Sequence, residues 1–200
     1  MSRAVTVVDH GAGNLASVVR ALERVGAEVV VSSDPQGVAN AERLVVPGQG
    51  AFPDAMERLT RGGLADAIQR YTESERPYLG ICLGLQLLFE SGEEQRETRG
   101  LGVLQGRVAR LPRAPGVKLP HMGWNTVSGP PPIPHGEHFY FVHSYVVLPA
   151  PGLDVWTTEH AGVEFVSAVR RDALFAVQFH PEKSHRAGLA LLQTWLQGGA

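Results

Sequence analysis

The sequence lacks several features that would indicate particular classes of protein. It has a single cysteine in 200 residues, which excludes an internal disulfide framework and a cysteine-rich zinc site. Its 18 basic and 20 acidic residues nearly balance, so the charge pattern indicates neither nucleic-acid nor anionic-membrane binding. No apolar run approaches the roughly 20 residues that span a bilayer, and residues 1–5 enter a strand pattern without a signal peptide. These absences predict a soluble, cytoplasmic protein.

What is present predicts one globular domain over residues 1–200, because 44% of the residues are apolar and 19% charged. β-Branched runs alternate with helical patterns in the first half of the chain. This alternation predicts an α/β fold with a doubly wound, mostly parallel, flavodoxin-like sheet. From residue 106 onward short strands follow one another, including one over 139–147, and predict an additional antiparallel β region. The last helix is expected over 184–196.

The segment Gly80-Ile-Cys82-Leu-Gly84 has the pattern of a nucleophile elbow with cysteine as the nucleophile. It follows an apolar strand pattern and begins an apolar run at helical spacing that extends to Phe89. A turn of this kind places the sulfur at a helix N-terminus, where negative charge is favoured. Because a lone cysteine is more often a small buried side chain, the interpretation requires a base and oxyanion donors elsewhere.

The segment Phe179-His-Pro-Glu182 can provide the base. Residues two apart on an extended chain point to the same side, and Pro181 disfavours a helical conformation at His180. We therefore predict a Cys-His-Glu triad in which Cys82 attacks, His180 transfers protons and Glu182 orients the imidazole.

Oxyanion donors are expected at backbone amides near the nucleophile. The residue after a nucleophile is a usual donor, and small residues in a glycine-rich loop let the backbone approach a substrate. The predicted donors are the amide of Leu83 and, as the second, the amide of Gly48, Gln49 or Gly50.

The sequence predicts neither a metal nor a cofactor. His135 and His138 lie in a proline-rich turn, and no carboxylate completes a recognisable zinc set with them. Gly11 and Gly13 begin a dinucleotide-binding pattern after the first strand, but Ala16 interrupts it.

Three segments together resemble the class I glutamine amidotransferases: Pro47-Gly-Gln-Gly50, Gly80-Ile-Cys-Leu-Gly-Leu-Gln86 and Phe179-His-Pro-Glu-Lys-Ser184. The resemblance implies hydrolysis of the glutamine side-chain amide to glutamate and ammonia through a thioester. It gives Cys82, His180 and Glu182 the triad roles stated above. It also implies substrate contacts from Gln86 and from the segment formed by His143, Ser144 and Tyr145.

Three further segments resemble the glutaminase subunit of imidazole glycerol phosphate synthase: Val8-Asp-His-Gly-Ala-Gly-Asn14, His121-Met-Gly-Trp-Asn125 and Tyr140-Phe-Val-His-Ser-Tyr145. This resemblance implies a heterodimer with a (β/α)8-barrel cyclase, which uses the ammonia to form imidazole glycerol phosphate and aminoimidazole carboxamide ribotide in histidine biosynthesis. The residues expected near the interface are Asn14, Trp124, Tyr140 and Lys183. The chain departs from that subunit at His10 and Gln49, where Tyr and Val are more common; a backbone donor at Gln49 does not depend on its side chain.

Other functions remain open from the sequence. The chain could be the glutaminase of anthranilate, aminodeoxychorismate or pyridoxal phosphate synthesis, although the segment 121–125 argues against these. A cysteine peptidase or esterase would use the same elbow, but Gln86 and the segment 143–145 favour glutamine as substrate. A flavodoxin-like binding module without activity is the non-enzymatic alternative.

Overall fold

The computed structural model describes residues 3–133 and 135–198; Met1 and Ser2, which belong to the N-terminal segment discussed above, lie outside the described residues. The strands are β1 (Ala4–Val8), β2 (Glu28–Ser32), β3 (Leu44–Gly48), β4 (Tyr78–Cys82), β5 (Phe89–Gly92), β6 (Thr98–Arg99), β7 (Leu104–Arg110), β8 (His121–Val127), β9 (Glu137–His143), β10 (Tyr145–Pro149), β11 (Asp154–His160), β12 (Val163–Arg171) and β13 (Leu174–Val177). The helices are α1 (Leu15–Arg24), α2 (Pro35–Ala39), α3 (Phe52–Arg61), α4 (Leu64–Thr72), α5 (Leu83–Gln86), the 3-10 turn η1 (Pro181–Lys183) and α6 (His185–Leu196). No helix within the described ranges is long and apolar enough to cross a membrane.

The main sheet has the strand order β2-β1-β3-β4-β13-β12-β10-β7-β5-β6, with β11 beside β12. Strands β2, β1, β3, β4 and β13 are parallel neighbours. Antiparallel pairs begin at β12 and continue through β10 and β7. The predicted fold class, a doubly wound sheet with an added antiparallel region, is confirmed.

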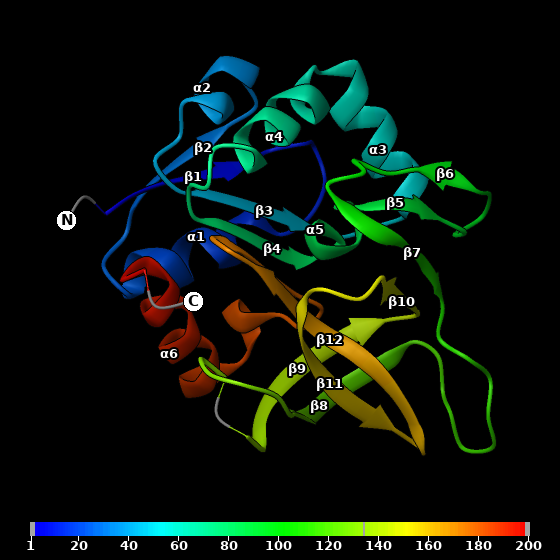
Figure 1. Cartoon of the computed structure of the whole chain (residues 1–200). Coiled ribbons are helices and arrows are strands. Elements are labelled where there is room, and N and C mark those ends of the chain that lie inside the picture. Colours follow the sequence, from blue (N-terminus) through cyan, green and yellow to red (C-terminus); the bar gives the residue numbers. More distant parts are fainter. Residues whose placement is uncertain (1–2, 134, 199–200) are drawn as a thin grey trace.

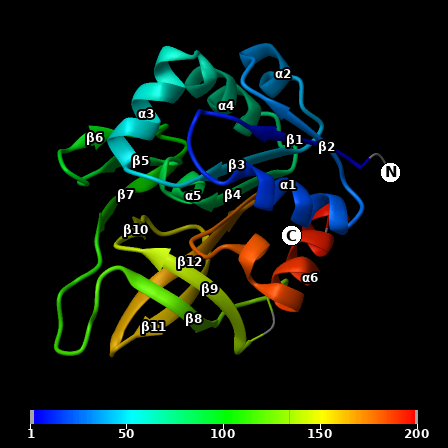
Figure 2. The same cartoon turned by 180° about the vertical axis from the view of Figure 1, so that it is seen from behind.

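Helices cover both faces of the parallel part of the sheet. Figures 1 and 2 show α2, α3 and α4 on one face and α1 and α6 on the other. Successive side chains of each strand point alternately into the two resulting cores. Val46 and Tyr78 pack on the α3–α4 side, whereas Val45 and Leu79 pack on the α1–α6 side. Strands buried on both faces read as continuous apolar runs, which explains why the sequence revealed them.

The strand predicted over residues 139–147 is divided in the structure. Strand β9 ends at His143 and pairs with β8 in a separate two-stranded sheet, whereas β10 starts at Tyr145 and joins the main sheet beside β7. The chain passes from one sheet to the other at Ser144. A continuous run of strand-forming residues gives no sign of a change of partner, because pairing depends on distant segments.

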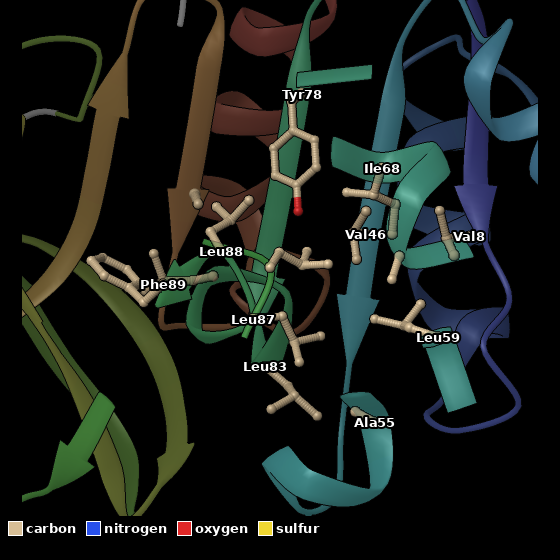
Figure 3. Close-up of a cluster of buried hydrophobic side chains, with 14 of the residues drawn as sticks. Val8, Val46, Ala55, Leu59, Ile68, Tyr78, Leu83, Leu87, Leu88 and Phe89 are labelled. Atoms are coloured by element: carbon tan, nitrogen blue, oxygen red, sulfur yellow. The ribbon is translucent and has the colours of Figure 1, made fainter. Parts of the chain in front are cut away.

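The helix after Cys82 is shorter than its apolar pattern predicts. Helix α5 ends at Gln86 and the chain re-enters the sheet as β5 at Phe89. Figure 3 shows Leu83, Leu87, Leu88 and Phe89 in one core with residues of α3 and α4. A run buried on every side has no amphipathic period, so its pattern does not separate helix from strand.

Glycines let the elbow pack against the neighbouring strand. A Cβ atom at Gly84 would overlap the carbonyl oxygen of Val46, and one at Gly48 would lie 2.7 Å from Cβ of Leu83. Gly48 is the register partner of Cys82 in the β3–β4 pair. The turn into α5 therefore sits directly against the end of β3, at the edge where parallel α/β sheets place their sites.

Candidate active site

Cys82 occupies a constrained turn at the end of β4. Its φ of 55° and ψ of −104° lie outside the conformations that non-glycine residues usually adopt, and such a residue costs on the order of 1–3 kcal/mol. The side chain is 7% exposed, and it reaches the wall of a cavity of about 410 Å3. The turn thus brings the only thiol of the chain to a place where a small molecule can contact it.

His180 and Glu182 form a buried pair beside this cavity. Nδ1 of His180 lies 2.8 Å from Oε1 of Glu182, with 2% and 3% of the two side chains exposed. His180 is extended, as expected, but Glu182 belongs to the 3-10 turn η1. The contact therefore arises from a tight turn rather than from the extended segment that the sequence analysis assumed.

The protein backbone fixes the position of His180. Its N–H donates to the carbonyl of Tyr140 on β9 (2.9 Å). The hydroxyl of Ser184 donates to the carbonyl of His180 (2.6 Å) and accepts from the N–H of Tyr140 (3.0 Å). These bonds hold the main chain of His180, and the contact with Glu182 orients its ring.

The surroundings of His180 favour its protonated form. Burial lowers the pKa of the imidazole, but interactions with Cys82 and Glu182 outweigh burial and raise it to about 9. Nε2 is buried and makes no hydrogen bond of good geometry with the described residues, although the Cys82 sulfur is near enough to affect the pKa. Catalytic hydrogen bonds are often long in the absence of substrate, and an imidazolium here would stabilise an adjacent thiolate.

The cavity brings together many of the predicted residues and some unpredicted ones. Its lining includes the predicted Gln49, Gly50, Cys82, Gln86, His143, Ser144, Tyr145, His180 and Lys183, and the unpredicted Glu94, Pro120 and Val142. Three predicted residues lie behind this lining: Glu182 supports His180, and Leu83 and Gly48 form the packed turn described above. The antiparallel region thus closes the site over the edge of the parallel sheet.

The end of β3 is connected to the loop that follows β1. Nε2 of His10 lies 3.1 Å from the carbonyl oxygen of Pro47, and the His10 side chain is buried. Burial lowers the pKa of His10, against a smaller opposing effect of this contact. Because a carbonyl oxygen only accepts, the ring donates through Nε2. His10 therefore contacts the end of β3, directly before the predicted oxyanion donors.

Gln178 contacts Cys82 but was missed among the predicted site residues. Its Nε2 donates to Sγ of Cys82 (3.6 Å), and its Oε1 accepts from Nε2 of Gln86 (3.0 Å). A polar residue that ends the apolar run Leu174–Val177 was the available signal, because a buried amide requires partners.

Glu94 was also missed. Its carboxylate lines the cavity and accepts a hydrogen bond from the N–H of Phe52 (2.7 Å), at the start of α3. Glu94 lies in a segment that links β5 to β6, and its sequence neighbourhood is rich in charge without a motif. We find no sequence signal for it.

His143 belongs to a buried hydrogen-bond chain. Asn125 donates Nδ2–H to Nε2 of His121 (3.2 Å), and Nδ1 of His121 lies 3.0 Å from Nε2 of His143. Nδ1 of His143 lies 3.0 Å from the carbonyl of Tyr145. Because a carbonyl only accepts, each ring donates through Nδ1 and accepts through Nε2. Both nitrogens of His143 are thus engaged within the protein.

The buried hydrogen bonds of His121 and His143 predict that the folded state becomes less stable in acid. Burial, with repulsion from His160, lowers the pKa of His121 to about 4; burial likewise lowers the pKa of His143 to about 3. Unfolded histidines titrate near 6.5, so only the unfolded state gains protons as the pH falls from 6.5 towards 4. The contribution of each neutral, buried histidine to the free energy of unfolding is therefore fully present above pH 6.5. Between pH 7 and pH 5 the free energy of unfolding falls by about 2 kcal/mol for one such histidine. Urea unfolding at the two pH values measures this difference.

A matched pair of variants isolates the contribution of the buried ring. His121→Gln should make the drop in unfolding free energy between pH 7 and pH 5 smaller, whereas replacement of the exposed His138 by Gln should leave it unchanged. An equal drop in the His121→Gln variant and the wild type would contradict the role of His121.

Three of the four predicted interface residues lie together. The Trp124 ring packs edge-on against Tyr140 at 6.2 Å between centroids, and Nζ of Lys183 lies 5.9 Å from the Tyr140 ring. Trp124 is 46% exposed and stacks on His185. Asn14 caps α1 by accepting from the N–H of Ser17. It lines a small cavity together with Pro47, Gln49 and Glu182.

Within residues 3–133 and 135–198, no group of three or more His, Cys, Asp or Glu side chains is arranged to hold a metal ion.

Known proteins resemble the chain in sequence and in fold. A family model described as "Glutamine amidotransferase class-I" matches residues 6–196. Imidazole glycerol phosphate synthase subunit HisH of Moorella thermoacetica is 48% identical over 199 residues, which cover 96% of this chain and 94% of the relative. The chloroplastic imidazole glycerol phosphate synthase hisHF of Arabidopsis thaliana is 44% identical over 96% of this chain, and the match covers 34% of the relative. A solved structure of a glutamine amidotransferase superposes with a TM-score of 0.76 at 22% identity, covering 96% and 98% of the two chains.

Proposed function

Because this chain belongs to the class-I glutamine amidotransferases, and within them to the HisH subunits of imidazole glycerol phosphate synthase, we propose that it hydrolyses glutamine and supplies the ammonia to a cyclase subunit. The observation that carries the proposal is the placement of Cys82 and His180 on one cavity wall, with Glu182 bonded to the far nitrogen of His180.

In the first half of the proposed reaction, Sγ of Cys82 attacks the side-chain amide carbon of glutamine. The carbonyl oxygen becomes an oxyanion and accepts hydrogen bonds from the amide of Leu83 and from the loop Gly48–Gly50. His180, protonated at Nε2, gives its proton to the departing nitrogen, and ammonia leaves. The enzyme then holds a thioester between Cys82 and the glutamyl group.

In the second half, His180 acts as a base for water. Its free Nε2 takes a proton from a water molecule, whose oxygen attacks the thioester carbon. Collapse of the second oxyanion breaks the C–S bond, so glutamate leaves and Cys82 is regenerated as a thiolate beside imidazolium. Glu182 keeps the ring in one orientation and stabilises its positive charge in both halves.

The partner is proposed as a cyclase with a (β/α)8 barrel that forms a heterodimer with this chain. The name of the Moorella relative calls it a subunit, and the match to the Arabidopsis relative leaves about two thirds of that chain for other functions. Delivery within a complex also has a physical reason, because ammonia released to water at neutral pH is diluted and protonated. Histidine biosynthesis is the pathway that this partner implies.

Glutamine turnover with and without the cognate cyclase subunit tests the proposal. We expect glutamate to form, and to form faster when the cyclase and its nucleotide substrate are present. Absence of glutamate under both conditions would exclude the glutaminase function. If glutamate forms but size-exclusion chromatography shows no complex with the cyclase, the glutaminase function is retained and the proposed partner is refuted.

A further inference from the structure

Gln178 lies between β13 and η1 and has no part in the steps above. It is 0% exposed, and its N–H donates to the carbonyl of Ser167 on β12 (2.8 Å). A fully buried amide side chain is costly unless its donors and acceptor are all used. The partners of its side chain therefore indicate what the residue does.

A backbone carbonyl determines which way the Gln178 amide points. The carbonyl of Tyr145 can only accept, so the atom of Gln86 that lies 3.1 Å away must be its NH2 group. The same NH2 group lies 3.0 Å from the Gln178 side chain and donates there too, which makes the contacted atom Oε1. The Gln178 NH2 group is consequently the one that faces Sγ of Cys82, at 3.6 Å.

We propose that Gln178 is a positioning residue for the nucleophile: its Nε2–H donates to Sγ of Cys82, fixes the sulfur against the end of β13 and stabilises the thiolate. Gln86 acts one step further away, because it holds Gln178 in the donating orientation. This role rests on the proposed function only in treating Cys82 as the nucleophile.

The donor also directs the thiol proton. With one side of the sulfur occupied by an N–H, the S–H bond points away from Gln178. On the His180 side, Nδ1 is bonded to Glu182, which leaves Nε2 as the acceptor. The proton moves from Sγ to Nε2 of His180, the S–H bond breaks, and the negative sulfur keeps the hydrogen bond from Gln178.

The rate at which iodoacetamide alkylates Cys82 tests this role independently of glutamine. The chain has one cysteine, so mass spectrometry of the intact protein reports on Cys82 alone. The thiolate displaces iodide as the S–C bond forms, and the rate against pH follows the thiolate population. In Gln178→Met, which removes the donor at similar volume, we expect the half-maximal pH of alkylation to rise by about one unit, so that the rate well below the wild-type half-maximal pH falls about tenfold.

Gln178→Glu keeps the shape and replaces the donor by a carboxylate oxygen. It should slow alkylation further, because negative charge then faces the sulfur. Ser167→Ala is the matched control, since Ser167 is equally buried and is the backbone partner of Gln178; its alkylation should stay within about twofold of wild type, as a site without contact to the sulfur. If Gln178→Met does not fold, Gln178→Glu decides.

Two results would overturn the role of Gln178: an unchanged rate in both variants, or a slower rate with an unchanged half-maximal pH, which reports altered access instead. Glutamine turnover by the wild type separates the two proposals. A wild type that hydrolyses no glutamine, yet shows the predicted shift on substitution, refutes the glutaminase and retains Gln178 as the residue that holds the sulfur.

Discussion

Cys82→Ala is expected to lower glutamine hydrolysis at least about 10⁴-fold, because the thioester cannot form without the sulfur. Removal of a nucleophile that works with a base typically costs on the order of 10⁶ in kcat, and binding plus oxyanion donors leave a residual rate. The loss should appear in kcat, while the affinity for glutamine changes little. Steady-state glutamate formation and isothermal titration with glutamine measure the two quantities.

The fold should survive this substitution. Sγ is removed from a turn whose path is set by backbone packing at Gly48 and Gly84, so circular dichroism and the thermal midpoint should stay near those of wild type. Retention of more than a tenth of the wild-type activity by a folded Cys82→Ala protein would exclude the thioester mechanism.

Glu182→Gln is expected to lower kcat by about 10³- to 10⁴-fold. The 2.8 Å contact with Nδ1 of His180 orients the ring, and the carboxylate helps to raise the pKa of His180 to about 9. An amide keeps the size but carries no charge, so the imidazolium loses support; the comparable carboxylate-to-amide change in a serine protease triad costs about 10⁴. Glutamine turnover from pH 5.5 to pH 9.5 measures both the rate and the pH dependence.

The same contact determines how the stability of the folded state depends on pH. Because the pKa of His180 is raised, the ion pair of His180 and Glu182 stabilises the folded state fully below pH 6.5, and this stabilisation is lost as the pH rises through about 9. In Glu182→Gln the loss of stability should begin at lower pH. Replacement of the exposed Glu137 by Gln serves as the control and should change neither kcat nor the pH profile. Wild-type kcat in Glu182→Gln would refute the orienting role.

The parallel part of the fold could be predicted because its signals are local. Strand β1 (Ala4–Val8) is a run of mostly β-branched residues, and helices α1, α3 and α4 have apolar faces that point to a core. The resemblance to class I glutamine amidotransferases is confirmed by the match over residues 6–196. That residues 1–200 form a single domain stays a prediction.

The parts that could not be predicted depend on contacts between distant segments. Helix α5 ends early because Phe89 pairs with β7, and the strand over 139–147 divides because its halves have different neighbours. At the site, the sequence indicates Cys82, His180 and Glu182 by short motifs. Gln178 acquires its role only through Gln86 and Tyr145, which lie 92 and 33 positions away along the chain.

The tight packing around the elbow also determines how the protein tolerates variation. At Gly48, Gly80 and Gly84 a single added methyl group would meet Leu83, the Gly84 carbonyl and the Val46 carbonyl respectively. A mutational scan scored by growth without histidine would therefore mark these three positions as intolerant, although no side chain there takes part in chemistry. Such a scan would therefore mark more positions than the reacting groups as essential to the active site. The additional positions would be intolerant only because there is no space for a larger side chain.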